Sequence, residues 1–352
     1  MTSRPPSSRA GTISSRCGRR VVALCVLYLF SLVSRPSAAE VGSQCQAAGI
    51  GRDSSCSVNG AVLHYVDWGG QGTDLVLIAG FGNTARIFDE LGPLLSRHHR
   101  VIAVTRRGFG SSSVTQSGYD ADNLAKDVVD LMTAVGVQKA DIVGHSMAGE
   151  ELTHIGTTYP ERVRRLVYLD AAYDRSNMEA LLAKDPVTNR APSQSALKSY
   201  ESLTQWTQAL LKSHSPAIEA DLHKTYASTP AGLKSRLSET AAAAVMAGVL
   251  SDKPDYRKIG APALALYSDW SHPDQLPPGL SKTLRDKADA YYAGTVRPWQ
   301  VAEERRFTQN IKCGQTVQLE RSGHYFFLEK PAETVAYIDS FLASDAPCKA
   351  SR

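Results

Sequence analysis

A lone serine lies between apolar residues and two glutamates in the stretch IVGHSMAGEE, residues 142–151. The apolar residues before it indicate a buried strand, and the glutamates after it suit the first turn of a helix. A serine at the tip of such a strand-turn-helix has its hydroxyl raised above the sheet edge, where it can act as a nucleophile. The alternative is a serine that only caps the helix. Ser146 is therefore a candidate nucleophile, and its companions decide between the two interpretations.

A serine hydroxyl is a poor nucleophile unless a neighbouring base takes its proton. His324 has the context of such a base, because it follows the last strand-like run through a short turn at Ser322 and Gly323 and precedes a helical stretch. The other histidines lie in turns, strands or helical stretches without this context, and none has metal-ligand spacing. Ser146 and His324 together predict acyl chemistry that uses no metal and no organic cofactor.

The tetrahedral intermediate of acyl transfer needs backbone N–H donors for its oxyanion. One donor is expected from Met147, directly after the serine, and the other from the turn that ends the strand in LVLIAGFGNT. Phe81, between two glycines, is the natural second donor, and the other interpretation of this glycine pair is a simple turn. We therefore predict an oxyanion hole formed by Phe81 and Met147.

Strand-like runs and helical stretches alternate along the chain. Short β-type runs recur at residues 75–78, 101–105, 141–143, 166–169, 263–267 and 317–319. Helical stretches separate them, as at Ala121–Val135, where apolar residues recur at helical spacing. This alternation predicts a mostly parallel sheet with helices on both faces. Asn59 and Gly60 between apolar stretches indicate a hairpin that adds antiparallel strands at one edge.

Residues 175–258 interrupt the alternation. They contain helix-like segments at 195–213, 218–226 and 237–250 and no convincing strand. We expect a helical cap insertion that lies over the sheet and divides the core into residues 57–174 and 259–348. Tyr200, Trp206 and Leu210 of this insertion either line an acyl pocket or pack the helices together.

Five motifs appear in an order and spacing similar to those of the alpha/beta-hydrolase superfamily: AGFGNT, TRRGFGSS, GHSMAG, VYLDAAYD and SGHYFF. The resemblance covers roughly Val58–Ala343. It implies an α/β class protein with the alpha/beta-hydrolase fold, which has a mostly parallel central sheet, helices on both faces and a helical cap insertion. Ala79, Thr105 and Ala148 depart from the histidine, aspartate and glycine frequent in the family. These departures affect turn details and subfamily, and they leave the nucleophile in place.

The resemblance also implies an acidic residue that orients the histidine. In most relatives it follows the strand after the insertion, which makes Asp269 and Asp274 candidates. In some relatives, including part of the haloalkane dehalogenase group, it follows the strand before the insertion, where Asp170 lies. Spacing favours Asp170, because Asp269 falls too early and Asp274 too late. Asp269 stays open as the alternative acid.

Residues 1–39 differ in composition from the rest of the chain. Six arginines and no acidic residue flank an apolar run of 13 residues at 21–33, and small residues follow at 37–39. This layout is typical of a secretory signal peptide cut after Ala39, and the alternative is a membrane anchor at residues 21–33. We expect a secreted or periplasmic protein that begins with an N-terminal extension at residues 40–56. No stable membrane span is expected after processing.

Removal of this leader lowers the formal net charge from +4 to −2. No basic stripe interleaved with aromatic residues remains, so we expect a small-molecule substrate and no nucleic-acid partner. Four cysteines remain, which in an exported chain predict two disulfides with three possible connectivities: Cys45, Cys56, Cys313 and Cys348. The implied fold favours Cys45 with Cys56 and Cys313 with Cys348, because the closing helix returns toward the start of the last strand.

These features predict an exported serine hydrolase that cleaves a carboxylic ester or a related acyl compound through an acyl-enzyme intermediate. Ser146 is the nucleophile, His324 the base, and Asp170 or Asp269 the orienting acid. Two alternatives stay open. One is an acyltransferase or peptidase with the same triad, and the other is a non-catalytic receptor that closes its lid over a ligand. Analogy of fold does not identify the substrate.

Overall fold

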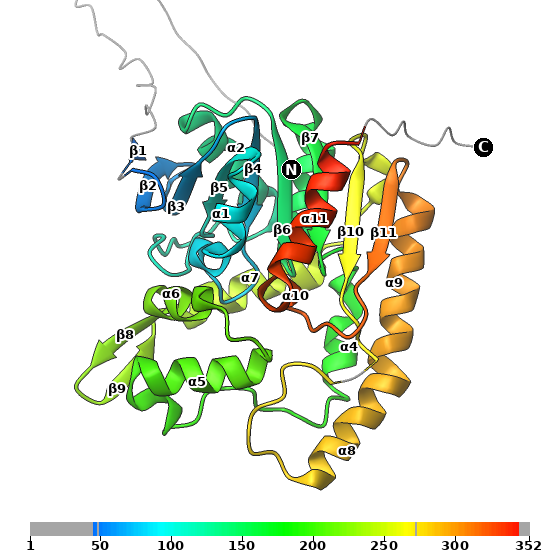
Figure 1. Cartoon of the computed structure of the whole chain (residues 1–352). Coiled ribbons are helices and arrows are strands. Elements are labelled where there is room, and N and C mark those ends of the chain that lie inside the picture. The colour runs from blue at the N-terminus through cyan, green and yellow to red at the C-terminus, as the bar shows by residue number, and fades with distance from the viewer. Residues whose placement is uncertain (1–44, 48, 272, 345–352) are drawn as a thin grey trace, which may run out of the picture. The chain divides into compact units, whose positions relative to one another are not determined.

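The computed structural model describes residues 45–47, 49–271 and 273–344. Within this part of the chain, nine strands form one sheet in the order β1-β2-β3-β5-β4-β6-β7-β10-β11 (Figure 1). Their bounds are Cys45–Gln46 (β1), Asp53–Val58 (β2), Ala61–Gly69 (β3), Thr73–Ile78 (β4), His99–Val104 (β5), Ala140–His145 (β6), Val163–Leu169 (β7), Ala263–Tyr267 (β10) and Gly314–Gln318 (β11). From β5 to β11, neighbouring strands are parallel, which confirms the predicted mostly parallel sheet.

The antiparallel part of the sheet lies at one edge. β3 pairs antiparallel with β2 and with β5, and β2 also pairs antiparallel with β1. Asn59 and Gly60 connect β2 to β3 with φ of 45° and 72°, a conformation that asparagine and glycine adopt more readily than other residues. The hairpin predicted at these residues is therefore confirmed.

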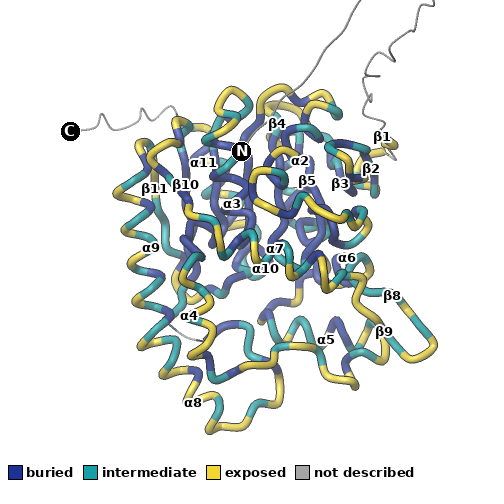
Figure 2. The backbone as a smooth tube through the Cα atoms, turned by 180° about the vertical axis from the view of Figure 1, so that it is seen from behind, coloured by how far each residue is buried: buried dark blue, intermediate teal, exposed yellow. Residues whose placement is uncertain are grey.

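Helices cover both faces of the sheet. On one face lie α1 (Leu91–Leu95) and α11 (Pro331–Leu342), and on the other lie α2 (Ala121–Ala134), α3 (Ala148–Thr158) and α9 (Arg297–Asn310). Alternate residues of a central strand face opposite layers, so Ile142 packs in the core beside α2 and α3 while Val143 packs in the other core. Figure 2 shows the strands as buried and the outer helices as partly exposed. Burial on both faces explains why these strands are continuous apolar runs.

Between β7 and β10 the chain leaves the sheet and lies beyond the carboxyl ends of the strands (Figure 1). We call residues 175–258 the cap. Its main elements are α4 (Met178–Leu182), α5 (Tyr200–Leu211), α6 (Pro216–Thr225), β8 (Tyr226–Thr229), β9 (Gly232–Ser235) and α7 (Glu239–Ser251). The expectation that this insertion contains no strand is wrong, because β8 and β9 pair as an antiparallel hairpin. Each strand has four residues, and most of their side chains are partly or fully exposed, so no alternating apolar pattern marks them.

A second segment, after β10, also reaches the cap. It contains α8 (Lys282–Tyr291) and a π-helical turn, η6 (Tyr292–Val296), that leads directly into α9. Tyr291 Oη donates a hydrogen bond of 2.8 Å to the backbone oxygen of Leu181 on α4. The sequence-based assignment of residues 259–348 entirely to the core therefore differs from the structure, in which α8 lies beside the cap (Figure 1).

A disulfide joins Cys45 on β1 to Cys56 on β2, which is the first of the two predicted pairs. Cys348 lies outside the described residues, so its pairing with Cys313 stays a prediction. The signal peptide predicted at residues 1–39 also lies outside them. Across the described ranges, no helix combines the length and the apolar character needed to span a membrane.

Candidate active site

Ser146 occupies the turn between β6 and α3. Its φ is 56°, a left-handed conformation that is uncommon for residues other than glycine. Two glycines let the strand, the helix and the neighbouring loop approach one another. A Cβ at Gly144 would collide with Leu152, and a Cβ at Gly149 would collide with the backbone oxygen of Ala171. The structure thus has the strand, tight turn and helix that the sequence predicts around this serine.

Ala148 fits the turn although many relatives have glycine at this position. It is fully buried, and a Cβ at Gly144 would lie only 3.0 Å from the Ala148 Cβ. The absence of a side chain at residue 144 therefore leaves the space that the alanine methyl group needs. The position at which a Cβ would collide with backbone is Gly149, one residue after Ala148.

His324 bonds to a partner through each ring nitrogen. It follows β11 after a short turn in which Arg321 has φ of 50°. His324 Nε2 lies 2.8 Å from Ser146 Oγ, and His324 Nδ1 lies 2.6 Å from Asp170 Oδ2. With Nδ1–H donating to the carboxylate, Nε2 is the nitrogen that can accept the serine proton. The structure brings Ser146, His324 and Asp170 into one hydrogen-bonded chain.

Asp170 lies fully buried at the end of β7, with φ of 47°. Burial alone raises the pKa of a carboxyl group, but hydrogen bonds from three side chains outweigh burial and lower the pKa of Asp170. The donors are His324, Tyr173 and Ser268. Trp270 Nε1 donates a further bond of 3.0 Å to Oδ2. This carboxylate is therefore ionised and fixed in orientation.

The two other carboxylates considered from the sequence lie elsewhere. Asp269 accepts hydrogen bonds from Ser271 and from the backbone N–H of Arg321. Asp274 Oδ2 accepts a bond of 2.6 Å from the backbone N–H of His324. Of these three aspartates, all among the described residues, only Asp170 bonds to the imidazole. Asp274 instead supports the loop that carries His324.

The two predicted oxyanion donors flank the serine. Met147 follows it as the N-cap of α3, and Phe81 follows Gly80 in the turn after β4. A Cβ at Gly80 would lie 3.0 Å from the Cβ of Ser146, so this turn approaches the serine closely. In the described part of the chain, neither the Phe81 nor the Met147 N–H donates to a protein acceptor. Both groups are therefore free to bind a substrate oxygen.

Two buried ion pairs, not predicted from the sequence, lie beside the turn that carries Ser146. Glu151 accepts bonds of 2.6 and 2.7 Å from Arg106, and Glu150 accepts bonds of 2.8 and 3.1 Å from Arg175. All four side chains are at most 6% exposed. From the sequence, the two glutamates are explained by their place at a helix N-terminus alone. The sequence holds one signal for these pairs, which is that each charged residue lies within or directly after one of the family-like motifs. Arg106 lies in TRRGFGSS, the glutamates follow GHSMAG, and Arg175 follows VYLDAAYD.

His145, which the sequence analysis treated as a spacer, packs against the catalytic candidates. Its ring centroid lies 4.6 Å from that of His324, and its Nε2 donates a bond of 3.0 Å to the backbone oxygen of His324. Burial, assisted by the neighbouring imidazole, lowers the pKa of His145 well below its usual range. A neutral His145 can therefore hold the His324 backbone without placing a second charge beside it.

A cavity of about 320 Å³ lies between the turn after β4 and the cap. Trp206 and Leu210 line it, as one interpretation of the sequence expects, together with Phe81 of the oxyanion turn. Tyr200 does not line the cavity, because its ring stacks on that of His223 with centroids 3.8 Å apart. The cavity therefore connects apolar cap side chains with one of the oxyanion donors.

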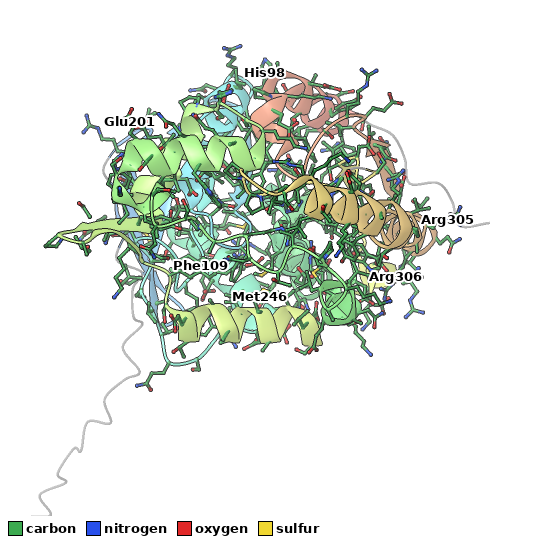
Figure 3. The ribbon with its side chains drawn as sticks, turned by 90° about the horizontal axis from the view of Figure 1, so that it is seen from below. His98, Phe109, Glu201, Met246, Arg305 and Arg306 are labelled. Carbon is green, nitrogen blue, oxygen red and sulfur yellow. A yellow bond between two sulfur atoms is a disulfide. The ribbon has the colours of Figure 1, made fainter. Side chains whose placement is uncertain are left out.

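Helix α7 of the cap packs against the side chain of Met147, the residue of the other predicted oxyanion donor. The side chain of Met147 packs in a small apolar cluster with Phe109 and Val245, and Met246 packs against this cluster. Figure 3 shows Phe109 and Met246 close together on the side of the molecule where α7 lies. Cap residues thus lie next to both predicted oxyanion residues, because α7 packs against Met147 while Trp206 and Leu210 line a cavity with Phe81.

A buried carboxylate joins the cap to the oxyanion turn. Asp221 on α6 accepts bonds of 2.7 and 2.6 Å from the backbone N–H and side chain of Thr84, and 2.9 Å from Asn83. Tyr325, next to His324, donates 2.8 Å to Asn83 Oδ1. Burial raises the pKa of Asp221 to about 6, because the donors only partly offset the loss of water.

In the ranges that the structure describes, no group of three His, Cys, Asp or Glu residues is arranged to hold a metal ion.

A family model for the alpha/beta hydrolase family matches residues 75–337, which is most of the chain. The chain therefore belongs to the alpha/beta hydrolase family. A putative non-heme chloroperoxidase from Synechocystis sp. is 37% identical over 122 residues, which are 34% of this chain and 43% of the relative. A 2-(acetamidomethylene)succinate hydrolase from Mesorhizobium japonicum is 29% identical over 226 residues, which are 62% of this chain and 78% of the relative. The chain thus spans less than half the length of the chloroperoxidase that it matches.

Solved structures show the same fold. The crystal structure of E-2-(acetamidomethylene)succinate hydrolase matches with a TM-score of 0.61 and 23% identity, covering 86% of this chain and 99% of that one. The enol-lactonase from Burkholderia xenovorans matches with a TM-score of 0.58 and 19% identity, covering 82% of this chain and 100% of that one. The predicted alpha/beta-hydrolase fold is confirmed, and relatives that are hydrolases support an enzyme of this class.

Proposed function

We propose that this protein is an exported serine hydrolase that cleaves a carboxylic ester or a related acyl compound. The observation that carries the proposal is the hydrogen-bonded chain from Asp170 through His324 to Ser146, in which the serine has a left-handed backbone. A serine that only capped α3 would need neither a bond to an imidazole nor this conformation.

In the proposed mechanism, Ser146 Oγ attacks the substrate carbonyl carbon while His324 Nε2 takes the hydroxyl proton. The carbonyl oxygen becomes an oxyanion, which the N–H groups of Phe81 and Met147 stabilise. Asp170 holds the imidazole in the right tautomer and stabilises its positive charge. His324 then gives the proton to the leaving oxygen as the carbon–oxygen bond breaks, and an acyl group stays on the serine.

Water completes the cycle in the same geometry. His324 Nε2 takes a proton from a water molecule, whose oxygen attacks the acyl carbon, and the second oxyanion occupies the same two N–H groups. Return of the proton to Ser146 Oγ releases the carboxylic acid. The cavity contains apolar side chains, among them Phe81, Trp206 and Leu210, beside polar ones such as Asn83 and Asp221. Its apolar part supports an acyl group with a hydrocarbon part.

Export is proposed from two features near the N-terminus of the sequence. Residues 1–39 have the composition of a secretory leader, and the disulfide between Cys45 and Cys56 fits an oxidising compartment, where disulfides persist. Fusion of residues 1–45 to a reporter that is active only outside the cytoplasm tests this point. A reporter that stays inactive with this leader would contradict export.

The catalytic part is tested by p-nitrophenol release from esters of increasing acyl length, with Ser146→Ala beside the mature protein. We expect turnover that is lost in the variant, by about 10⁴-fold or more in kcat. The acyl length with the highest kcat/KM then indicates the length of acyl chain that the cavity accommodates. Equal turnover by both proteins would refute Ser146 as nucleophile, and the absence of turnover on every ester would refute the ester substrate.

A further inference from the structure

The buried arginines Arg106 and Arg175 each bond to one particular backbone oxygen beside the serine. Arg106 Nη1 donates to the oxygen of Gly80 at 3.3 Å, and Arg175 Nη2 donates to the oxygen of Ser146 at 2.9 Å. The Gly80 oxygen belongs to the peptide unit whose N–H is that of Phe81. The Ser146 oxygen belongs to the peptide unit whose N–H is that of Met147. These are the two predicted oxyanion donors.

A hydrogen bond to the oxygen of a peptide unit also determines where the N–H of the same unit points. The unit is planar and trans, so its C=O and its N–H point in opposite directions. A guanidinium that holds the oxygen on the buried side therefore fixes the direction of the N–H on the other side. For both units the N–H has no protein acceptor among the described residues, while the oxygen has a cationic donor.

We propose that Arg106 and Arg175 are positioning residues of the oxyanion hole, each of which orients and polarises one of its two donor peptides. The proposal rests on the proposed serine hydrolase function. A charged donor on the carbonyl strengthens the partial charge on the N–H of the same unit, since hydrogen bonds in a low-dielectric site polarise one another. Neither arginine touches the substrate in this account.

The glutamate partners explain how two cations are tolerated in this position. An unpaired guanidinium is strongly destabilised by burial, whereas a hydrogen-bonded pair with a carboxylate is not. Glu150 and Glu151 are consecutive at the start of α3, so one helical turn supplies the partner for both arginines. Arg106 also bonds to Ala79, at 3.1 Å, and Arg175 to Ala171, at 3.4 Å, which fixes the strand ends that flank the site.

The backbone oxygens of Gly80 and Ser146 also accept hydrogen bonds from other groups. The Gly80 oxygen also accepts a bond of 3.4 Å from the N–H of Asn83, and the Ser146 oxygen accepts one of 3.1 Å from the N–H of Gly149. These are neutral donors, which bond less strongly than a guanidinium. Loss of an arginine should therefore weaken the oxyanion hole without abolishing it.

The chain contains a matched control in the next residue. Arg107 is as buried as Arg106 and bonds to Asp127 in the same way, but its remaining bonds go to the backbone oxygens of Asn59 and Ser117. The double variants R106Q/E151Q and R107Q/D127N each remove one buried ion pair without leaving an unpaired charge. Similar losses of thermal stability are expected from both, so a difference in catalysis isolates the position of the arginine.

The experiment measures kcat and KM for p-nitrophenyl esters and the affinity for an alkyl trifluoromethyl ketone, which forms a hemiketal oxyanion on the serine. We expect R106Q/E151Q to lose about 10- to 100-fold in kcat at nearly unchanged KM, with the ketone weakened by a similar factor. R107Q/D127N should stay within about threefold of the parent protein. Equal losses in the two double variants, or an unchanged kcat in R106Q/E151Q, would overturn the proposal.

Two further measurements cover failure to fold and failure of the proposed function. Arg106→Lys keeps the positive charge opposite Glu151 but loses the planar guanidinium that bonds to Glu151 and to the Gly80 oxygen at once. A fall in kcat at constant KM is therefore again expected. In protein labelled with ¹⁵N-phenylalanine, Arg106→Lys should shift the amide signal of Phe81, whereas Arg107→Lys should leave it in place. An unmoved Phe81 signal overturns the proposal even if no ester is cleaved. Activity that survives Ser146→Ala would instead refute the proposed function.

Discussion

The carboxyl edge of the sheet and the cap differ in how they hold polar groups. At the edge, Ser146 and Asp170 have left-handed backbones, and Asp170 alone accepts hydrogen bonds from four side chains. The cap is joined to the core at separate points, such as Asp221, which accepts bonds from Thr84 and Asn83, and Ser215, whose Oγ donates to Glu90 at 2.6 Å. The polar groups of the edge therefore form one dense network, whereas the contacts of the cap are spread over several places. We infer that changes at the edge alter kcat or folding, while changes in the cap alter substrate choice and pH dependence.

The largest expected effect tests the edge through its acid. Asp170→Asn should lower kcat by about 10³- to 10⁴-fold with little change in KM, because an amide cannot fix the tautomer of His324 or stabilise its cation. Steady-state kinetics on the best ester measures this loss. Asp269→Asn is the matched control, since among the described residues its carboxylate accepts hydrogen bonds from Ser271 and Arg321 and from no imidazole. A loss in the control as large as that in Asp170→Asn would contradict the assignment of the acid.

The next effect concerns the close packing at the edge. Gly149→Ala should destabilise the fold by about 3 kcal/mol or more, because the new methyl group collides with the Ala171 backbone oxygen. The gain in helix propensity, about 1 kcal/mol, is too small to offset this collision. Urea unfolding measures the difference. Gly260→Ala, where nothing lies within 4 Å of the new atom, should change stability by less than about 0.5 kcal/mol. Similar stability for both variants would refute the packing argument.

A third prediction concerns the cap contact at Asp221, whose pKa is raised by burial from 3.8 to about 6. Between these values the folded state binds more protons than the unfolded state, so the free energy of unfolding falls as pH rises through this window. The contribution of this group is about 3 kcal/mol, fully present below pH 4 and lost by about pH 7. Asp221→Asn should remove that slope, as measured by urea unfolding at several pH values. An unchanged slope in the variant would contradict the burial argument.

The smallest effect concerns the cap side of the cavity. Trp206→Ala enlarges the space beside Phe81, so the preferred acyl chain should become longer. KM for the original best ester should rise about 10-fold, with kcat within about threefold. Tyr200→Ala is the control, because Tyr200 is packed on His223 outside the cavity. If both variants changed chain preference alike, the cavity would not be the acyl site.

The sequence predicted the parts of this molecule that are encoded locally. A strand, a small-residue turn and a helix are adjacent in the chain, so the positions of Ser146 and His324 follow from short motifs. The identity of the acid did not follow, because Asp170 and Asp269 both end strands and only the packing of β7 beside β10 shows which carboxylate reaches the imidazole.

The ion pairs between distant segments could not be predicted from the sequence either. Arg106 meets Glu151 across 45 residues, and Arg175 meets Glu150 across 25, so neither pair leaves a periodic signal. The strands β8 and β9 were missed for a different reason. Each has only four residues, and β8 directly follows α6, whose apolar spacing continues up to Tyr226, so the pattern in the sequence favours a helix there.

The central claim is that Ser146 carries the acyl group. The most direct measurement mixes the mature protein with a slowly hydrolysed p-nitrophenyl ester, quenches it with acid during the burst, and maps the acyl mass by peptide mass spectrometry. The account predicts one acyl group on the peptide that contains Ser146, and none when Asp170→Asn is quenched at the same time. Acyl mass on another residue, or ester turnover with no covalent adduct at any time, would contradict it.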